Sequence, residues 1–260
     1  MPTDLHAILT AYLCFWLAVS GAVLGSFFDC AVSRWAAEEP PFRGRSCCSS
    51  CGHTLSAADL VPVFSFLVRR GRCRWCGAKI PAECLAAELA GAASFLCLGA
   101  VFGAAPALGQ WLIWAALLLA LSLADCARQL LPDPLVLGLC VNRLAWVFLL
   151  REDIPQAALT ALAACAVPAA LLCAVLLGEK YTGRELMGGG DIKLLFALAL
   201  YFTWAQMLLT LLIGCALGLV WALCAKRRRA AVPFGPFLAL GAWGTLCFGG
   251  PLIAWYIGLF

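Results

Sequence analysis

The sequence predicts an all-α polytopic membrane protein with about eight transmembrane helices and a small cysteine-rich loop domain. The chain of 260 residues is 64% hydrophobic and only 12% charged, and its mean hydropathy is +0.94. A soluble domain carries about twice this share of charged residues, so the exterior of a soluble fold could not be solvated. The apolar residues also lie in long continuous runs, which are typical of membrane-spanning helices.

Eight apolar runs are candidates for these helices. They cover residues 7–28, 84–104, 108–124, 135–150, 156–177, 192–203, 205–225 and 237–258. A helix needs about 20 residues to cross the hydrocarbon core, with a range of about 17–25, so the runs at 135–150 and 192–203 are short. The first run is too long for the core of a signal peptide and has no basic leader before it, so we expect a retained helix.

The positions of Lys and Arg predict the orientation, because cytoplasmic loops carry an excess of basic residues. Placing the N-terminus outside makes four segments cytoplasmic, namely 29–83, 125–134, 178–193 and 226–236. These segments hold sixteen of the 18 basic residues, including Lys226, Arg227, Arg228 and Arg229. Both termini are therefore expected outside. Of the other two basic residues, Arg151 falls outside, and Arg143 falls within a predicted span, where the sequence offers it no firm partner.

Two C-x-x-C pairs lie in the first predicted cytoplasmic segment. They are formed by Cys48, Cys51, Cys73 and Cys76. Two-residue spacing lets two thiolates face one tetrahedral metal, and two such pairs close a structural Zn²⁺ site. Disulfides or free thiols are the alternatives, but a cytoplasmic loop lies in a reducing compartment. Cys47 and His53 are expected to be bystanders, and the cysteines within apolar runs are expected to be packing residues.

Two carboxylates lie at the predicted membrane edge. A charge is energetically costly there, so an acidic residue at this depth indicates a functional role. Asp125 ends the third apolar run and Asp191 precedes the sixth, so both are expected on the cytoplasmic side at the same depth. Two carboxylates brought together can share a proton, so that one serves as general base on a water and the other as general acid. The pair therefore predicts aspartic protease chemistry.

Three glycines, Gly188, Gly189 and Gly190, precede Asp191. A loop without side chains would let an extended substrate peptide approach and pair with its backbone. The alternative is that Asp191 is only the N-cap of the following helix and the glycines only a flexible connection. Asp133 is assigned a structural role, because an Asp followed by Pro134 is typical of an N-cap.

Two other classes of protein fit parts of this pattern. Acidic residues and glycine-broken helices also suit a proton- or cation-coupled transporter, although transporter acids usually lie near the midplane of the membrane. A membrane-anchored zinc-ribbon adaptor would explain the cysteines, but it would not require two acids at one face.

The chain resembles the bacterial type IV prepilin peptidases, which are membrane aspartic proteases of the G-x-G-D type. The family patterns G-x-x-x-G-S-F-x-N, S-x-C-x-x-C, R-G-x-C-x-x-C, D-x-x-x-x-x-L-P-D, G-x-G-D-x-K-L and P-F-G-P-F-L-A occur in order over most of the chain. The matching segments begin at Gly21, Ser46, Arg70, Asp125, Gly188 and Pro233. Asp29 stands where the family has asparagine, and Ser49 where it usually has proline.

The resemblance implies an endopeptidase of the bacterial cytoplasmic membrane that removes the leader peptide of type IV prepilins or pseudopilins at the cytoplasmic face. Asp125 and Asp191 carry over as the catalytic pair. Many members also methylate the new N-terminus with S-adenosylmethionine, and this activity is associated with the cytoplasmic loop. The expected parts are a first transmembrane helix (1–28), a zinc-binding loop domain (29–83) and a membrane peptidase domain (84–260). Lipid surrounds the spans, and no nucleic-acid partner is expected.

Overall fold

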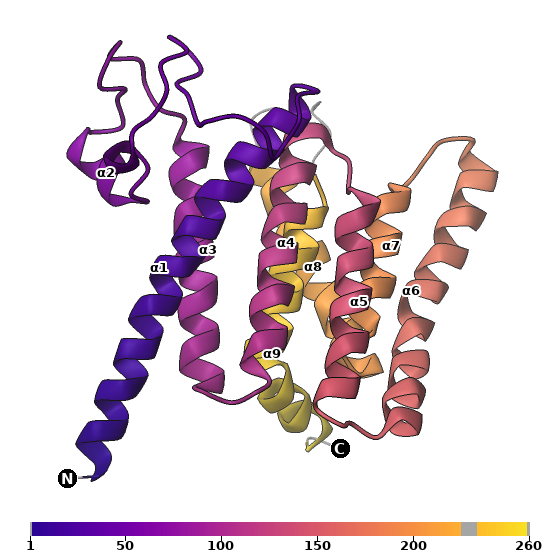
Figure 1. Ribbon diagram of the computed structural model, residues 1–260. Coiled ribbons are helices and arrows are strands. Elements are labelled where there is room, and N and C mark those ends of the chain that lie inside the picture. The colour runs from indigo at the N-terminus through magenta and orange to yellow at the C-terminus, as the bar shows by residue number, and fades with distance from the viewer. Residues whose placement is uncertain (1, 225–232, 259–260) are drawn as a thin grey trace. The chain divides into compact units, whose positions relative to one another are not determined.

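The computed structural model describes residues 2–224 and 233–258, and these residues form helices and loops without a β-strand. Lys226, Arg227, Arg228 and Arg229 lie outside the described residues. The elements, labelled in Figure 1 where there is room, are α1 (Pro2–Ala36), a 3-10 turn (Ala57–Asp59), α2 (Phe64–Val68), α3 (Ala82–Phe102), α4 (Leu108–Arg128), α5 (Asp133–Leu149), α6 (Ile154–Thr182), α7 (Gly189–Ala199), α8 (Trp204–Cys224) and α9 (Gly235–Ile257).

Each of the eight apolar runs forms a helix, which confirms the predicted all-α membrane fold. Six helices are long and apolar enough to cross a membrane, namely α1, α3, α4, α6, α8 and α9. Helix α5 has 17 residues and α7 has 11, so the count of eight spans stays a prediction. Helix α1 continues to Ala36, past the expected end at 28, because residues 29–36 contain neither glycine nor proline to stop it.

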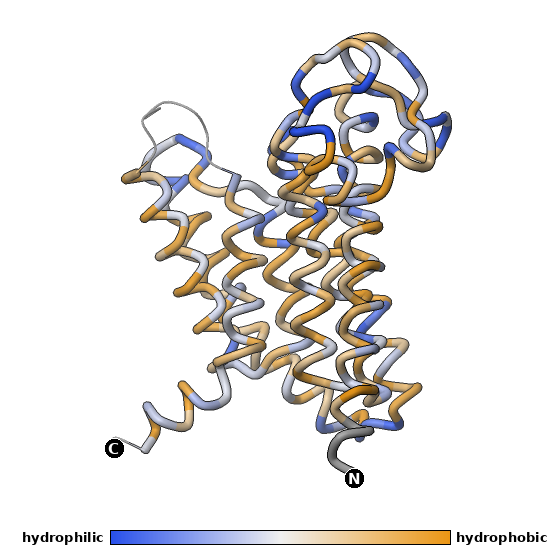
Figure 2. The backbone as a smooth tube through the Cα atoms, turned by 90° about the vertical axis from the view of Figure 1, so that its left-hand side faces the viewer, coloured by the Kyte–Doolittle hydropathy of each residue, from blue (hydrophilic) through white to orange (hydrophobic). Residues whose placement is uncertain are grey.

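The chain folds as two compact units, Met1–Leu123 and Ala124–Phe260. The expected parts 1–28, 29–83 and 84–260 stay predictions, because this division follows packing within the chain and does not test them. In the first unit, the hydrophilic residues gather in the loop between α1 and α3, while the helices are mostly apolar (Figure 2).

Helices α1 and α3 of the first unit lie side by side (Figure 1). Their contact is made by small residues: a Cβ at Gly21 would meet the carbonyl of Gly91, and a Cβ at Gly25 would meet the carbonyl of Ala87. Small residues four apart let helix backbones approach closely in a membrane, where van der Waals packing replaces the hydrophobic effect. The G-x-x-x-G stretch of α1 therefore forms the seam with α3.

In the second unit, α7 contacts α5, α6, α8 and α9 and buries Leu194, Leu195 and Leu198 almost completely. Helices α8 and α9 are joined by a buried hydrogen bond of 2.9 Å between the hydroxyls of Thr210 and Thr245. A hydroxyl in lipid needs a partner within the protein, so this bond fixes the register of the two helices.

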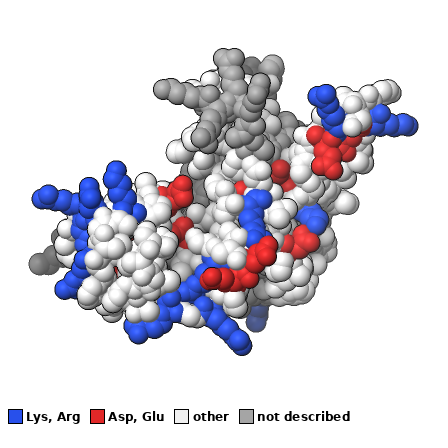
Figure 3. Space-filling view, turned by 90° about the horizontal axis from the view of Figure 1, so that it is seen from above, with Lys and Arg blue, Asp and Glu red and all other residues white. Residues whose placement is uncertain are grey.

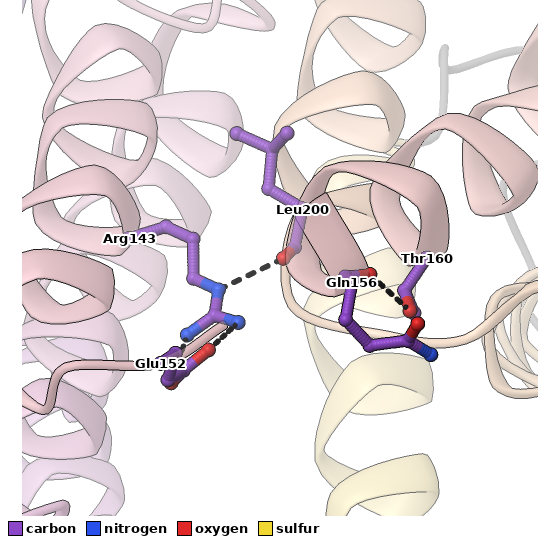
Figure 4. Close-up of polar contacts among 5 residues, drawn as sticks. All are labelled: Arg143, Glu152, Gln156, Thr160 and Leu200. Carbon is purple, nitrogen blue, oxygen red and sulfur yellow. Dashed lines mark hydrogen bonds and ion pairs between the residues drawn. The ribbon is translucent and has the colours of Figure 1, made fainter. Parts of the chain in front are cut away.

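Arg143, which the sequence left without a firm partner, is held by three hydrogen bonds (Figure 4). Its Nη1 and Nη2 donate to the two carboxylate oxygens of Glu152 at 2.8 and 2.7 Å, and its Nε donates to the carbonyl of Leu200 at 3.0 Å. Leu200 follows the last residue of α7, so a cation sits where the carbonyl dipoles of that helix converge. The pair fixes the C-terminal end of α7 against α5.

We expect Gly91→Leu to lower the free energy of unfolding by about 1–3 kcal/mol or more, the usual cost of overpacking. The new side chain would overlap the Gly21 carbonyl. Thermal unfolding in detergent would measure the loss. Ala93→Leu is the matched control, since it places the same side chain at an exposed position of α3. Equal melting temperatures for the two variants would contradict the close α1–α3 seam.

Candidate functional site

Asp125 lies in the last turn of α4 and is only 5% exposed. Its Oδ2 accepts a hydrogen bond of 2.8 Å from the backbone N–H of Gly235. A carboxylate at a helix C-terminus is disfavoured by the helix dipole, but Gly235 is the first residue of α9, whose N-terminus favours a negative charge. The start of α9 therefore compensates for the position of Asp125 at the end of α4.

Gly235 is a site residue that sequence analysis did not identify. A Cβ at this position would lie 2.9 Å from Asp125 Oδ2, so a side chain would displace the carboxylate or the helix. Its contribution is a backbone N–H, which leaves no chemical signature in the sequence. The one available signal was its place in the Pro233–Ala239 motif.

Asp191 is the third residue of α7 and is half-buried. The N-cap of this helix is Gly188, so the alternative that Asp191 is the N-cap is wrong. A carboxylate in the first turn is still favoured by the N–H groups at the start of the helix. Asp125 and Asp191 are close enough to interact electrostatically. The structure thus brings together the two carboxylates that the sequence singled out, both within the second unit.

The expectation of a three-glycine loop is wrong for two of its members, because Gly189 and Gly190 form the first turn of α7 and only Gly188 precedes it. Glycine is nevertheless needed for close approach at two positions. A Cβ at Gly188 would lie 3.3 Å from Asp191 Oδ2, and one at Gly190 would lie 3.1 Å from the Cβ of Leu131. A Cβ at Gly189 would meet nothing within 4 Å, so open space lies beside the start of α7.

Asp133 makes a structural contact, but not the one that was expected. It is the first residue of α5 and Pro132 is the N-cap, so the N-cap expectation for Asp133 is wrong. Its Oδ1 instead accepts a hydrogen bond of 2.7 Å from Lys193 Nζ. Since Lys193 lies in α7, this ion pair ties the start of α5 to the first turns of the helix that carries Asp191.

The four cysteines of the C-x-x-C pairs converge in the first unit. The Sγ atoms of Cys48, Cys51, Cys73 and Cys76 all lie within 4.8 Å of one another, and those of Cys48 and Cys76 are 3.9 Å apart. A tetrahedral site with metal–sulfur bonds of about 2.3 Å places its sulfurs about 3.8 Å apart. The cluster can therefore hold a metal ion. All 16 cysteines lie within the described residues, and none forms a disulfide.

The two halves of this cluster have the same backbone geometry. The Cys48 and Cys73 N–H groups donate to the carbonyls of His53 and Ala78 at 3.0 and 2.8 Å. Gly52 and Gly77, one residue after each second cysteine, have φ of +69° and +70°, which favours glycine. Each turn brings both cysteines of its pair to the common cluster, as a metal knuckle requires.

Hydrogen bonds from the backbone of Cys51 and then of Ser50 lower the pKa of the Cys48 thiol to about 6. The same groups would stabilise a thiolate ligand. His53 stacks on Trp75, with ring centroids 4.0 Å apart, and neither His53 nor Cys47 belongs to the metal-ligating cluster of the described residues. That both are bystanders stays a prediction.

Two acidic residues of the first unit, Asp59 and Glu88, make structural contacts. Asp59 accepts a hydrogen bond of 2.6 Å from Ser56 Oγ and forms an ion pair with Arg69. The hydrogen bonds from Ser56 lower the pKa of the Asp59 carboxyl group, and the positive charges of Arg69 and Arg74 lower it further. Glu88 Oε2 accepts a hydrogen bond of 2.6 Å from the backbone N–H of Val63. These acids thus fold the loop and dock it on α3.

In a comparison with known proteins, the cysteine cluster and the carboxylate pair each fall in a region that matches a known protein family. Residues 19–102, which include the four cysteines, match the Bacterial Peptidase A24 N-terminal domain. Residues 112–223, which include Asp125 and Asp191, match the Type IV leader peptidase family. Gly235 lies beyond both matched regions. No solved structure matches the chain.

Curated proteins match the chain over most of its length. A prepilin leader peptidase/N-methyltransferase of Burkholderia pseudomallei is 35% identical, over 90% of this chain and 84% of that protein. Proteins with the same name from Pseudomonas putida and Bacillus subtilis are 31% and 30% identical. These two matches cover 95% and 93% of this chain, and 95% and 96% of the respective relatives.

Proposed function

This chain belongs to the type IV leader peptidase family, and on that premise we propose that it is an aspartic endopeptidase that cleaves the leader from type IV prepilins or pseudopilins. The observation that carries the assignment of the site is the placement of Asp125 and Asp191 at helix ends within one unit, buried and half-buried and near enough to interact electrostatically. One carboxylate deprotonates a water that attacks the scissile carbonyl, and the other protonates the leaving amine. Neither acid can do both at once.

The placement of the acids supports a peptidase over a transporter. Asp125 is in the last turn of α4 and Asp191 in the first turn of α7, so both lie at helix ends, whereas the acids of transporters usually lie near the middle of a span. The family comparisons give the transporter alternative no support. The open space beside Gly189, two residues from Asp191, would let an extended peptide approach the start of α7.

The face of the membrane follows from the basic residues. The loop between α1 and α3 carries seven of them, and Figure 3 shows Lys and Arg side chains around this loop, at the left of the view. Excess Lys and Arg mark the cytoplasmic side, so we place the metal-binding loop and the carboxylate pair at the cytoplasmic face of the bacterial inner membrane. The substrate leader is then cut where it emerges into the cytoplasm.

The second activity is N-methylation of the newly exposed N-terminus, as the names of the relatives indicate. S-adenosylmethionine would be consumed as the methyl donor, and no described residue is assigned to it. The four cysteines would hold a structural Zn²⁺, because four thiolates suit this ion and would leave no open position for catalysis. The loop thus contributes a folded surface rather than a reacting metal.

We expect Asp125→Asn and Asp191→Asn each to lower the cleavage rate by about 10²–10⁴-fold, the usual contribution of a general acid or base. The measurement is the leader-sized shift of a prepilin on a gel with purified enzyme. Asp133→Asn is the matched control, since asparagine can still accept the hydrogen bond from Lys193. Normal cleavage by Asp125→Asn together with loss in Asp133→Asn would show that the pair is assigned wrongly.

Gly235→Ala should lower cleavage by about 10²-fold, because a misplacement of about 1 Å at a reacting group has effects of this size and the added Cβ would lie 2.9 Å from Asp125 Oδ2. Gly250→Ala in the same helix is the control, because its Cβ would meet nothing within 4 Å. Initial rates with saturating prepilin separate the two variants. If Gly235→Ala matches Gly250→Ala in rate, the backbone contact to Asp125 has no role in catalysis.

Purified protein should contain about one Zn²⁺ per chain, and serine at Cys48, Cys51, Cys73 or Cys76 should remove most of it, because three thiolates no longer close the site. Elemental analysis measures the metal. Cys47→Ser is the control, since Cys47 is exposed and adjacent to the cluster but outside it. Equal zinc content in Cys47→Ser and Cys48→Ser would refute the site.

A further inference from the structure

A short helix in the metal-binding loop exposes an apolar surface. Phe64, Leu67 and Val68 of α2 are 64%, 63% and 65% exposed, and the preceding Leu60 and Val61 are 42% and 45% exposed. These five residues form the α2 patch. Contiguous apolar side chains of this size are rarely left in water and mark an interaction site.

A hydrogen bond ties the start of α2 to α3. Val63, the N-cap of α2, donates its N–H to Glu88 Oε2 at 2.6 Å. Glu88 lies six residues after Ala82, the first residue of α3, which is about 9 Å along a helix that rises 1.5 Å per residue. Helix α3 is a candidate membrane span, and Figure 1 shows α2 beside its upper end. The start of α2 is therefore held beside the second turn of a candidate spanning helix.

The backbone at this point is held in an uncommon conformation. Val63 has φ of +62°, in the region that a β-branched residue rarely adopts. Such a conformation persists only where the surroundings enforce it, and here the Glu88 carboxylate fixes the Val63 N–H. The direction in which α2 presents its apolar residues is thus set by the contact with α3.

Basic residues follow the α2 patch directly. Arg70, Arg72 and Arg74 are exposed, whereas Arg69 is occupied by Asp59. Exposed apolar side chains beside one end of a candidate spanning helix, flanked by several cations, are the combination that binds an anionic membrane surface.

We propose that the α2 patch inserts into the leaflet on the loop's side of the membrane, the cytoplasmic leaflet in the topology above, and that Arg70, Arg72 and Arg74 bind the phosphates of anionic phospholipids there. The loop is then attached to the lipid surface at a third place, in addition to α1 and α3. This contact is independent of the peptidase assignment, because none of its residues belongs to the carboxylate pair or to the cysteine cluster.

Photocrosslinking of the full-length protein tests the insertion. Benzoylphenylalanine replaces Leu67 in one sample and Trp75 in another, in nanodiscs of phosphatidylethanolamine and phosphatidylglycerol, and mass spectrometry identifies the adducts. Trp75 is the matched control because it is 58% exposed in the same loop but lies in a cysteine knuckle. We expect several-fold more lipid adduct at position 67. Equal lipid adduct at both positions, or adducts at position 67 with a second protein chain, would overturn the proposal.

The charge requirement has its own test with the same probe at position 67. Replacing Arg70 and Arg72 by glutamine should reduce the phosphatidylglycerol adduct relative to that with phosphatidylethanolamine. The control replaces Lys180 and Arg184, which removes equal charge from the second unit. Both samples are read for prepilin cleavage as well, so a loss of lipid contact is distinguished from a failure of the enzyme. An unchanged phosphatidylglycerol preference would refute the role of the arginines.

Discussion

The absence of water in the hydrocarbon core means that each polar group at membrane depth must find its partner within the protein. The polar contacts of the second unit follow from this constraint. Thr210 bonds to Thr245 across α8 and α9, and Arg143 bonds to Glu152 and to the end of α7. Asp125 accepts the first N–H of α9. Each such contact fixes two helices in register, so satisfying polar groups also defines the geometry of the candidate site.

Helix α7 connects these contacts to the chemistry. Its first turn carries Asp191 and, two residues later, Lys193 in the ion pair with Asp133. Its far end is held by Arg143 through the carbonyl of Leu200. With its apolar side chains buried between these ends, a helix of 11 residues has little freedom to slide or rotate. The position of Asp191 relative to Asp125 is therefore a property of the packed helix bundle.

The metal-binding loop achieves its order by different means, because it is polar and too small for a large core. Two knuckles of equal backbone geometry bring four thiols together, and the Asp59–Arg69 pair joins the segments around α2. Glu88 then docks the loop on α3. Because hydrogen bonds, an ion pair and the cysteine cluster hold the loop, the apolar residues of α2 stay exposed at its surface.

The sequence by itself determined the helices, the cysteine cluster and the carboxylate pair, because long apolar runs and close spacing of ligands are local properties of a chain. Only the tertiary structure decided that Gly235, 110 residues from Asp125, supplies its backbone partner. It also decided that Glu152 neutralises Arg143 and that α7 begins at Gly189 rather than after the glycines. Contacts of this kind depend on which helix ends meet in space, and a backbone donor carries no side-chain signature that a sequence could reveal.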